Sequence, residues 1–207
     1  MTDSIRENLS PAERFDLAFD VMRSADFLQM RGQLGEVPYF ILGHPAADEP
    51  EVGAQVKRLV SRLRADGIEV CEVDLWALAR ELWDETGQWE QILEQESALP
   101  KETFAEPVGN VISPQQYLAP RITSAVRAQE PTPQLVVLTH VGRLYPLVRA
   151  HAILNTLQPM LSDLPVVLVF PGEYRQSPTQ GASLVLFGQL LDDDYYRAFD
   201  LLKLGNP

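Results

Sequence analysis

Cysteine is almost absent from this sequence, because Cys71 is the only one among 207 residues. A single thiol cannot form an intramolecular disulfide, so a reducing compartment is expected, and its apolar run 68–73 favours a buried, inert thiol. Long apolar segments are absent as well: no window nears the roughly eighteen residues needed to span a bilayer. The first residues show no basic region followed by an apolar stretch. The sequence therefore predicts a cytoplasmic protein without a membrane segment.

Positive charge is also scarce. The sequence has 17 Lys and Arg residues against 29 Asp and Glu residues, which gives a net charge of −12. Such a charge repels phosphate backbones unless the basic residues are strongly clustered, and no such cluster is found. Direct nucleic-acid binding is thus disfavoured and stays only as an alternative. A basic protein partner or simple solubility would suit the charge.

Three catalytic and cofactor motifs are missing. No Gly-rich loop ends in Lys-Ser or Lys-Thr, so the backbone cradle and lysine for nucleotide phosphates are lacking, and the turn 43–48 has no lysine. No Gly-x-Gly-x-x-Gly occurs, which removes the usual dinucleotide fingerprint. No Gly-x-Ser-x-Gly offers a nucleophile elbow. We therefore expect neither ATP hydrolysis nor a bound cofactor.

The sequence does contain alternating strand and helix patterns along one domain, 1–207, with no linker that divides it. Short apolar runs predict strands at 38–43, 68–73, 135–139, 166–170 and 183–187. Start signals and helical spacing predict helices at 11–28, 50–65, 75–83, 113–128, 146–157 and 195–204. We predict that residues 89–113 form a surface excursion with one short helix.

This order of elements predicts an α/β fold. We expect a three-layer, largely parallel open sheet of about five strands with helices on both faces. The fold would be P-loop-like or Rossmann-like but without a nucleotide-binding loop. Strand order cannot be predicted from the sequence.

Polar residues follow several of the predicted strands. In open α/β sheets, ligands bind beyond the carboxyl ends of the strands. The candidates at these positions are His44, Asp74, His140 and Glu173. An enzyme that uses them, such as a metal-dependent hydrolase, is one alternative, but their spacing matches no metal-binding motif. We expect no metal.

Several tyrosines and arginines are candidates for a protein interface, because these residue types are enriched at the energetic centres of interfaces. They are Arg143, Tyr145, Tyr174, Tyr196 and Arg197. The alternative is structural: Arg143 and Arg197 would form internal ion pairs with Glu173 or Asp194, and the tyrosines would pack under loops.

Four segments together resemble one protein family. They are 139–151 (THVGRLYPLVRAH), 170–174 (FPGEY), 186–188 (LFG) and 195–199 (YYRAF). In this combination they look like the BrxB family of bacterial BREX systems. The resemblance implies a part in a multi-gene system that methylates host DNA and blocks phage replication. Its companions would include the alkaline-phosphatase-like PglZ, the methyltransferase PglX and a large ATPase.

The resemblance implies a protein without an established catalytic motif. This agrees with the absence of the three motifs described above. We therefore expect a non-enzymatic protein that binds other BREX proteins. An adaptor for PglZ is the leading hypothesis.

Overall fold

A central parallel sheet organises the molecule. The structure is a computed structural model. It describes residues 9–31, 37–95, 108–177, 181–192 and 198–204. Within these residues, five strands lie in the order β2-β3-β4-β1-β7, and each neighbouring pair runs parallel. They are β1 (Tyr39–His44), β2 (Val70–Asp74), β3 (Leu135–Thr139), β4 (Val166–Ser177) and β7 (Phe199–Asp200). The expected open, mostly parallel α/β sheet is confirmed.

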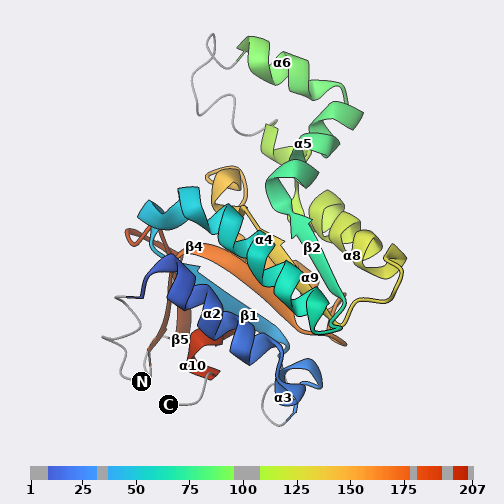
Figure 1. Cartoon of the computed structure of the whole chain (residues 1–207). Helices are drawn as coiled ribbons and strands as arrows, with labels where there is room; N and C mark the ends of the chain where they lie inside the picture. Colours follow the sequence, from blue (N-terminus) through green and yellow to red (C-terminus); the bar gives the residue numbers. More distant parts are fainter. Residues whose placement is uncertain (1–8, 32–36, 96–107, 178–180, 193–197, 205–207) are drawn as a thin grey trace.

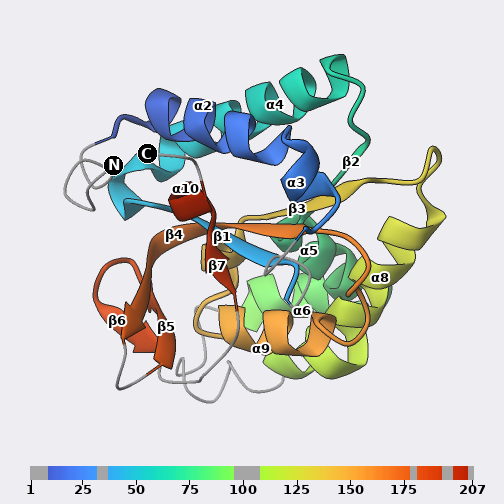
Figure 2. The same ribbon diagram turned by 90° about the horizontal axis from the view of Figure 1, so that it is seen from below.

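Helices cover both faces of this sheet, so the molecule has three layers (Figure 1, Figure 2). One face carries α2 (Pro11–Met22), α3 (Ala25–Leu28), α4 (Glu49–Ala65) and α10 (Leu201–Leu204). The other carries α5 (Leu75–Glu85), α8 (Ala119–Ala128) and α9 (Ala150–Leu157), and α6 (Gln88–Gln95) extends from α5 away from the sheet. Short turns of helix are η2 (Ala46–Asp48), η3 (Pro114–Leu118) and η4 (Val141–Leu144). No described helix is long and apolar enough to cross a membrane.

Strand β1 illustrates why the apolar runs are uninterrupted. Tyr39 and Ile41 face the helices α5, α8 and α9, whereas Phe40 and Leu42 face α2 and α4, and all four are 0% exposed. Successive side chains of a strand point to opposite faces, so a strand covered on both sides needs apolar residues throughout. The Tyr39 hydroxyl donates to the carbonyl of Leu161 at 3.2 Å, which satisfies its polar atom.

Local signals set two of the helix starts. Ser10 and Glu13 form the expected capping box, because the Glu13 carboxylate accepts from the Ser10 backbone N–H at 2.9 Å and the Ser10 hydroxyl accepts from the Glu13 N–H at 3.4 Å. Further along, Pro120 stands in the first turn of α8, where its missing N–H costs no helical bond. The predicted helix 113–128 therefore divides into η3 and α8.

Strand β4 does not end with the apolar run 166–170, as the sequence predicted, but continues to Ser177. Its second half leaves the parallel sheet and pairs antiparallel with β5 (Gly181–Leu186), which pairs in turn with β6 (Leu190–Asp192). Gly172 permits the close approach, since a Cβ there would lie 2.1 Å from the Val185 carbonyl oxygen. The run 183–187 forms this antiparallel extension, and β7 is the fifth parallel strand.

The predicted helix 195–204 was wrong at residues 198–200, and its first three residues, 195–197, lie outside the described residues. Phe199 and Asp200 form β7 beside β1, and the helix α10 begins at Leu201. The Phe199 ring stacks on Phe40 with centroids 6.0 Å apart, so a tertiary contact outweighs the helical spacing. Asp200 then caps α10, because its Oδ1 accepts from the Leu202 N–H at 3.1 Å. Asp194, the ion-pair candidate for Arg143 and Arg197, lies outside the described residues.

Candidate functional site

Asp74 ends β2 and begins α5. Its Oδ1 accepts hydrogen bonds from the backbone N–H groups of Trp76 and Ala77, both at 3.0 Å. These are donors that the first turn of a helix leaves without internal partners, so Asp74 is the N-cap of α5. The carboxylate is thereby held in one orientation, and its second oxygen, Oδ2, points to His140.

His140 follows β3 and lies next to Asp74, because Asp74 is in register with Thr139. Its backbone is left-handed, with φ 59° and ψ 25°, which is uncommon for a residue other than glycine. The Nδ1 atom lies 3.0 Å from Asp74 Oδ2. A carboxylate oxygen only accepts, so Nδ1 carries the proton in this contact, and Nε2 is an acceptor when the ring is neutral. The pair could hold an imidazole ready to accept a proton.

His44 belongs to a different environment, because it is only 2% exposed. Its Nδ1–H donates to the Pro45 carbonyl at 2.9 Å, and its Nε2 lies 3.5 Å from Glu49 Oε2 at the start of α4. Nearby, Arg14 Nη1 donates to the Gly43 carbonyl at 3.0 Å. His44 is therefore an interior residue that joins β1 to α4, and it does not reach the Asp74–His140 pair.

Burial of His44 makes the fold sensitive to pH. Burial lowers the pKa of the His44 imidazole, and this effect outweighs the Pro45 hydrogen bond and the charges of Glu49 and Asp48, which raise it. The unfolded chain therefore binds the proton more readily than the folded chain does. Stability should be complete above the unfolded pKa of about 6.5 and should be lost progressively as the pH falls below it.

Urea unfolding of the wild type and of His44→Gln, from about pH 7.5 to 5.5, checks this expectation. The free energy of unfolding of the wild type should fall more steeply over this interval than that of the variant. Equal slopes for the two chains would show that His44 is not the group responsible.

Glu173 lies on the antiparallel extension, where it is in register with Val185, and its side chain is 55% exposed. Its Oε2 accepts from Arg175 Nε at 3.0 Å and from Nη2 at 2.9 Å. The four strand-end candidates thus take part in three separate interactions. Across the described ranges, no group of three or more His, Cys, Asp or Glu side chains is arranged to hold a metal ion.

A second feature of this edge is an exposed surface of aromatic, apolar and basic side chains. The Tyr145 ring meets the edge of Phe187 with centroids 6.2 Å apart, and the Arg149 guanidinium lies 5.3 Å from the Tyr145 ring centroid. Leu190 lines the same small gap as Tyr145 and Arg149, and Arg143 is exposed in η4 two residues before Tyr145. We call Arg143, Tyr145, Arg149, Phe187 and Leu190 the strand-end surface.

The remaining interface candidates are placed differently. Tyr174 is half-buried against the core, and its hydroxyl donates to the Ala198 carbonyl at 2.6 Å, so it ties β4 to the segment that leads into β7. Tyr196 and Arg197 lie outside the described residues. Of the five interface candidates, Arg143 and Tyr145 therefore contribute to the strand-end surface.

Three residues of the strand-end surface were missed by the sequence analysis. Phe187 was placed at the end of the predicted strand 183–187 and Leu190 was given no role, although Gly188 after Phe187 is a turn signal that could have indicated exposure. Arg149 was assigned to a helix from Pro146 to about Leu157. That prediction was wrong at its start: Arg149 is extended, with φ −91° and ψ 141°, and α9 begins at Ala150.

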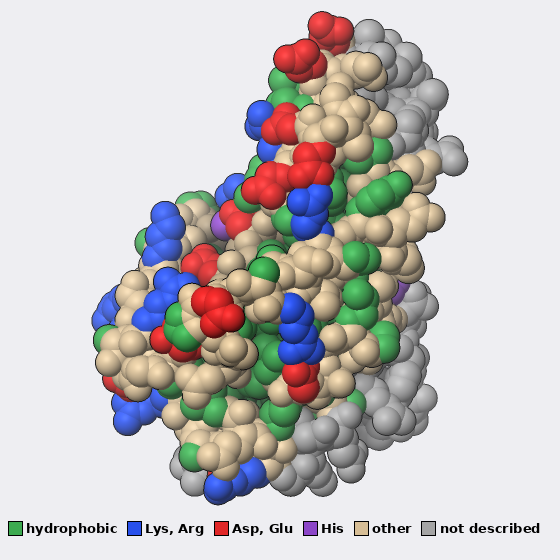
Figure 3. Space-filling model, turned by 90° about the vertical axis from the view of Figure 1, so that its right-hand side faces the viewer, with side chains coloured by type: hydrophobic (Ala, Val, Ile, Leu, Met, Phe, Trp, Pro, Cys, Tyr) green, Lys and Arg blue, Asp and Glu red, His purple; other side chains and the backbone are tan. Residues whose placement is uncertain are grey.

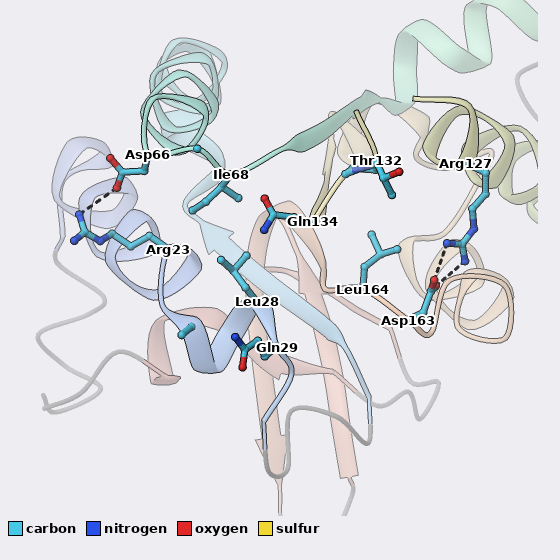
Figure 4. Close-up of a pocket in the computed structure, with 13 residues that line it drawn as sticks. Arg23, Leu28, Gln29, Asp66, Ile68, Arg127, Thr132, Gln134, Asp163 and Leu164 are labelled. Atoms are coloured by element: carbon cyan, nitrogen blue, oxygen red, sulfur yellow. Dashed lines mark hydrogen bonds and ion pairs between the residues drawn. The ribbon is translucent and has the colours of Figure 1, made fainter. Parts of the chain in front are cut away.

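A groove lies at the opposite edge, beside the starts of β2, β3 and β4 (Figure 4). Its volume is about 730 Å³. Arg23 pairs with Asp66 at 3.3 Å on one wall, and Arg127 pairs with Asp163 through two bonds of 2.6 and 2.7 Å on the other. Its apolar floor is nearly covered already, because Ile68 is 6% exposed and Leu164 is 7% exposed. Its charges are thus paired and little apolar area is open to a ligand.

Helices α5 and α6 form a projecting arm that displays acidic side chains (Figure 3). The exposed carboxylates are Glu81, Asp84, Glu85, Glu90 and Glu94. Asp84 pairs with Arg80 at 3.2 Å, and Glu85 pairs with Arg121. The Trp89 ring of α6 stacks on Trp83 of α5 with centroids 5.8 Å apart. Aromatic contacts therefore hold α6 on α5, while the outer face of the arm is acidic.

Comparison with known proteins gives a consistent result. A family model described as "BREX protein BrxB" matches residues 71–201. A BREX protein BrxB of Bacillus cereus (strain H3081.97) is 29% identical over 194 residues, which covers 92% of this chain and 96% of that protein. A BREX protein BrxB of Escherichia coli O9:H4 (strain HS) is 26% identical over 184 residues, covering 87% and 86%. No solved structure matches. The matched range contains the Asp74–His140 pair and the whole strand-end surface.

Proposed function

The chain belongs to the BrxB family, and we propose that it serves its BREX system as a non-catalytic adaptor that binds PglZ. Family membership makes the chain a BREX component. The adaptor role and the choice of PglZ are our proposal, and the strand-end surface is the observation that carries it.

The strand-end surface supports a protein-binding role by its composition. Among the described residues, four large hydrophobic side chains are exposed, and two of them, Phe187 at 39% and Leu190 at 37%, lie here. Tyrosine and arginine stand beside them, the residue types most often found at the energetic centres of interfaces. Exposed apolar side chains grouped in this way mark sites of association. The surface suits a protein partner that covers its aromatic rings.

The position of the surface supports the same role. Gly142 in η4 packs directly on β4, because a Cβ there would lie 2.5 Å from Pro171 Cγ. The turn that carries Arg143 and Tyr145 is thus held against the sheet. Loops fixed on a rigid scaffold are where binding residues concentrate, since little ordering is needed when the partner docks.

Co-purification tests the proposal. The tagged chain is produced together with PglZ, captured, and passed over a size-exclusion column at physiological salt. Co-elution with PglZ is the expected result. The same experiment with PglX and with the large ATPase shows whether another BREX protein takes the place of PglZ. Failure to co-elute with any of the three would contradict the adaptor role.

General-base chemistry at His140 is a second candidate function, favoured by the 3.0 Å contact that holds its ring against Asp74. The variant His140→Gln removes the base and keeps a polar side chain. If the adaptor role is the whole function, this variant keeps PglZ binding and phage protection in cells. A variant that folds and binds PglZ normally but gives no protection would establish a catalytic role instead.

A further inference from the structure

The turn between β5 and β6 holds an aromatic residue in a backbone conformation that disfavours it. Phe187 has φ +54° and is followed by Gly188 at φ +71°. Residues with a Cβ are strained in this left-handed region, and turns that need it use Asn, Asp or Gly almost always. Among the described residues, only Met30, His140 and Phe187 are non-glycine residues with positive φ. Two of these three lie at the same edge of the sheet.

Burial does not account for phenylalanine at this position. The strain of a bulky residue in such a turn is usually offset by packing in the core. Phe187, however, remains 39% exposed. Its ring approaches the half-buried Tyr145 edge to face and lies beside Gly142, where a Cβ would stand 3.4 Å from Phe187 Cε1. Backbone strain that the fold does not need is characteristic of residues kept for function.

The neighbours of Phe187 indicate the chemistry of what would cover it. Leu190 extends the apolar area, and Arg143 in η4 is exposed and has no ion pair with any described residue. The Arg149 guanidinium lies 5.3 Å from the Tyr145 ring centroid. Apolar side chains with arginines on the same surface are complementary to an apolar pocket with carboxylates on its rim.

We propose that Phe187 is the anchor of the adaptor surface. Its ring enters an apolar pocket of the bound partner protein, and Asp or Glu residues at the rim of that pocket pair with Arg143. This inference rests on the proposed adaptor function and adds the residue and the partner chemistry through which it acts. The strained turn holds the ring away from the core, where the partner can reach it.

The variant Phe187→Asn separates an anchoring role from a structural one. Asn adopts the left-handed conformation more readily than Phe, so the melting temperature should stay the same or rise. The affinity for purified PglZ, measured by calorimetric titration, should fall by roughly 30-fold or more, the loss typical of an interface anchor. Leu93→Ala is the matched control, because Leu93 is a 54% exposed apolar residue on α6, and it should change neither quantity.

Two further measurements test the partner chemistry. Phe187→Gly also suits the turn and should reproduce the loss of affinity without early melting. The wild-type affinity should weaken as salt is raised, and Arg143→Gln should reduce this salt dependence because it removes one charge pair.

The outcomes distinguish the inference from the function on which it rests. A wild-type chain that binds PglZ no better than Phe187→Asn does would overturn the anchor and leave the adaptor role standing. Early melting of both Phe187→Asn and Phe187→Gly would show that the ring supports the fold, and would equally overturn the anchor. A wild-type chain that binds none of the BREX proteins would remove the adaptor role and the anchor together.

Discussion

Replacing Trp83 with alanine is expected to lower the free energy of unfolding by about 3–5 kcal/mol, the cost typical of removing a buried aromatic side chain. Trp83 is 1% exposed and lies at the centre of a cluster with Trp76 and Trp89. Its indole N–H donates to the Val108 carbonyl at 3.0 Å, so the same ring joins α5, α6 and the segment that precedes η3. Its removal should therefore leave a cavity, an unpaired carbonyl and a loosened α6.

Urea unfolding followed by circular dichroism measures this effect. Trp83→Phe is the informative intermediate, because it keeps most of the packing but leaves the Val108 carbonyl without its donor, a loss of about 1–3 kcal/mol. Leu93→Ala, on the exposed side of α6, should change stability by no more than about 0.5 kcal/mol. If Trp83→Ala costs no more than Leu93→Ala does, the aromatic cluster does not stabilise the arm.

The double variant Arg143→Glu/Tyr145→Ala is expected to weaken the proposed complex with PglZ by about 100-fold or more, since truncating central aromatic and arginine residues commonly costs about 2 kcal/mol or more each. The first change reverses the charge offered to an acidic rim. The second removes the ring against which Phe187 and Arg149 lie. Because Tyr145 is only half-buried and Arg143 is exposed, the melting temperature should change little.

Calorimetric titration of the variant with PglZ, beside its thermal unfolding, checks both statements. Arg58→Glu is the matched charge reversal, because Arg58 is exposed on α4 away from the strand-end surface. It should bind PglZ as the wild type does. Unchanged affinity in the double variant would exclude these two residues from the interface. A large loss of stability would favour a structural role for them.

The strand-end candidates show which part of the candidate site could be predicted from the sequence. Residues after parallel strands can be found in the sequence, because each apolar run has a visible end and the carboxyl ends of such strands lie at one edge. Which of them meet depends on strand order. The order β2-β3-β4-β1-β7 places Asp74 beside His140 and separates both from His44. Glu173 is carried further away because β4 continues into the antiparallel extension.

The strand-end surface was only partly predictable for a related reason. Arg143 and Tyr145 follow an apolar run in an evident turn, and their residue types suggested an interface. In the sequence, Phe187 is the last residue of the predicted strand 183–187. It is exposed because the chain turns at Phe187 and Gly188, and a left-handed turn at phenylalanine contradicts the local preferences on which such predictions depend.

The sequence by itself determined the α/β class, the layers and most element positions, because hydrophobic period, caps and turn residues act over a few neighbouring residues. It also carried the family resemblance, through segments that remain recognisable without a structure. Only the tertiary structure decided the pairing of Asp74 with His140, the burial of His44, the strand at Phe199–Asp200 and the exposure of Phe187. Each of these depends on contacts between residues far apart in the chain, such as Phe40 with Phe199, whose energies outweigh local propensity and leave no periodic signal in the sequence.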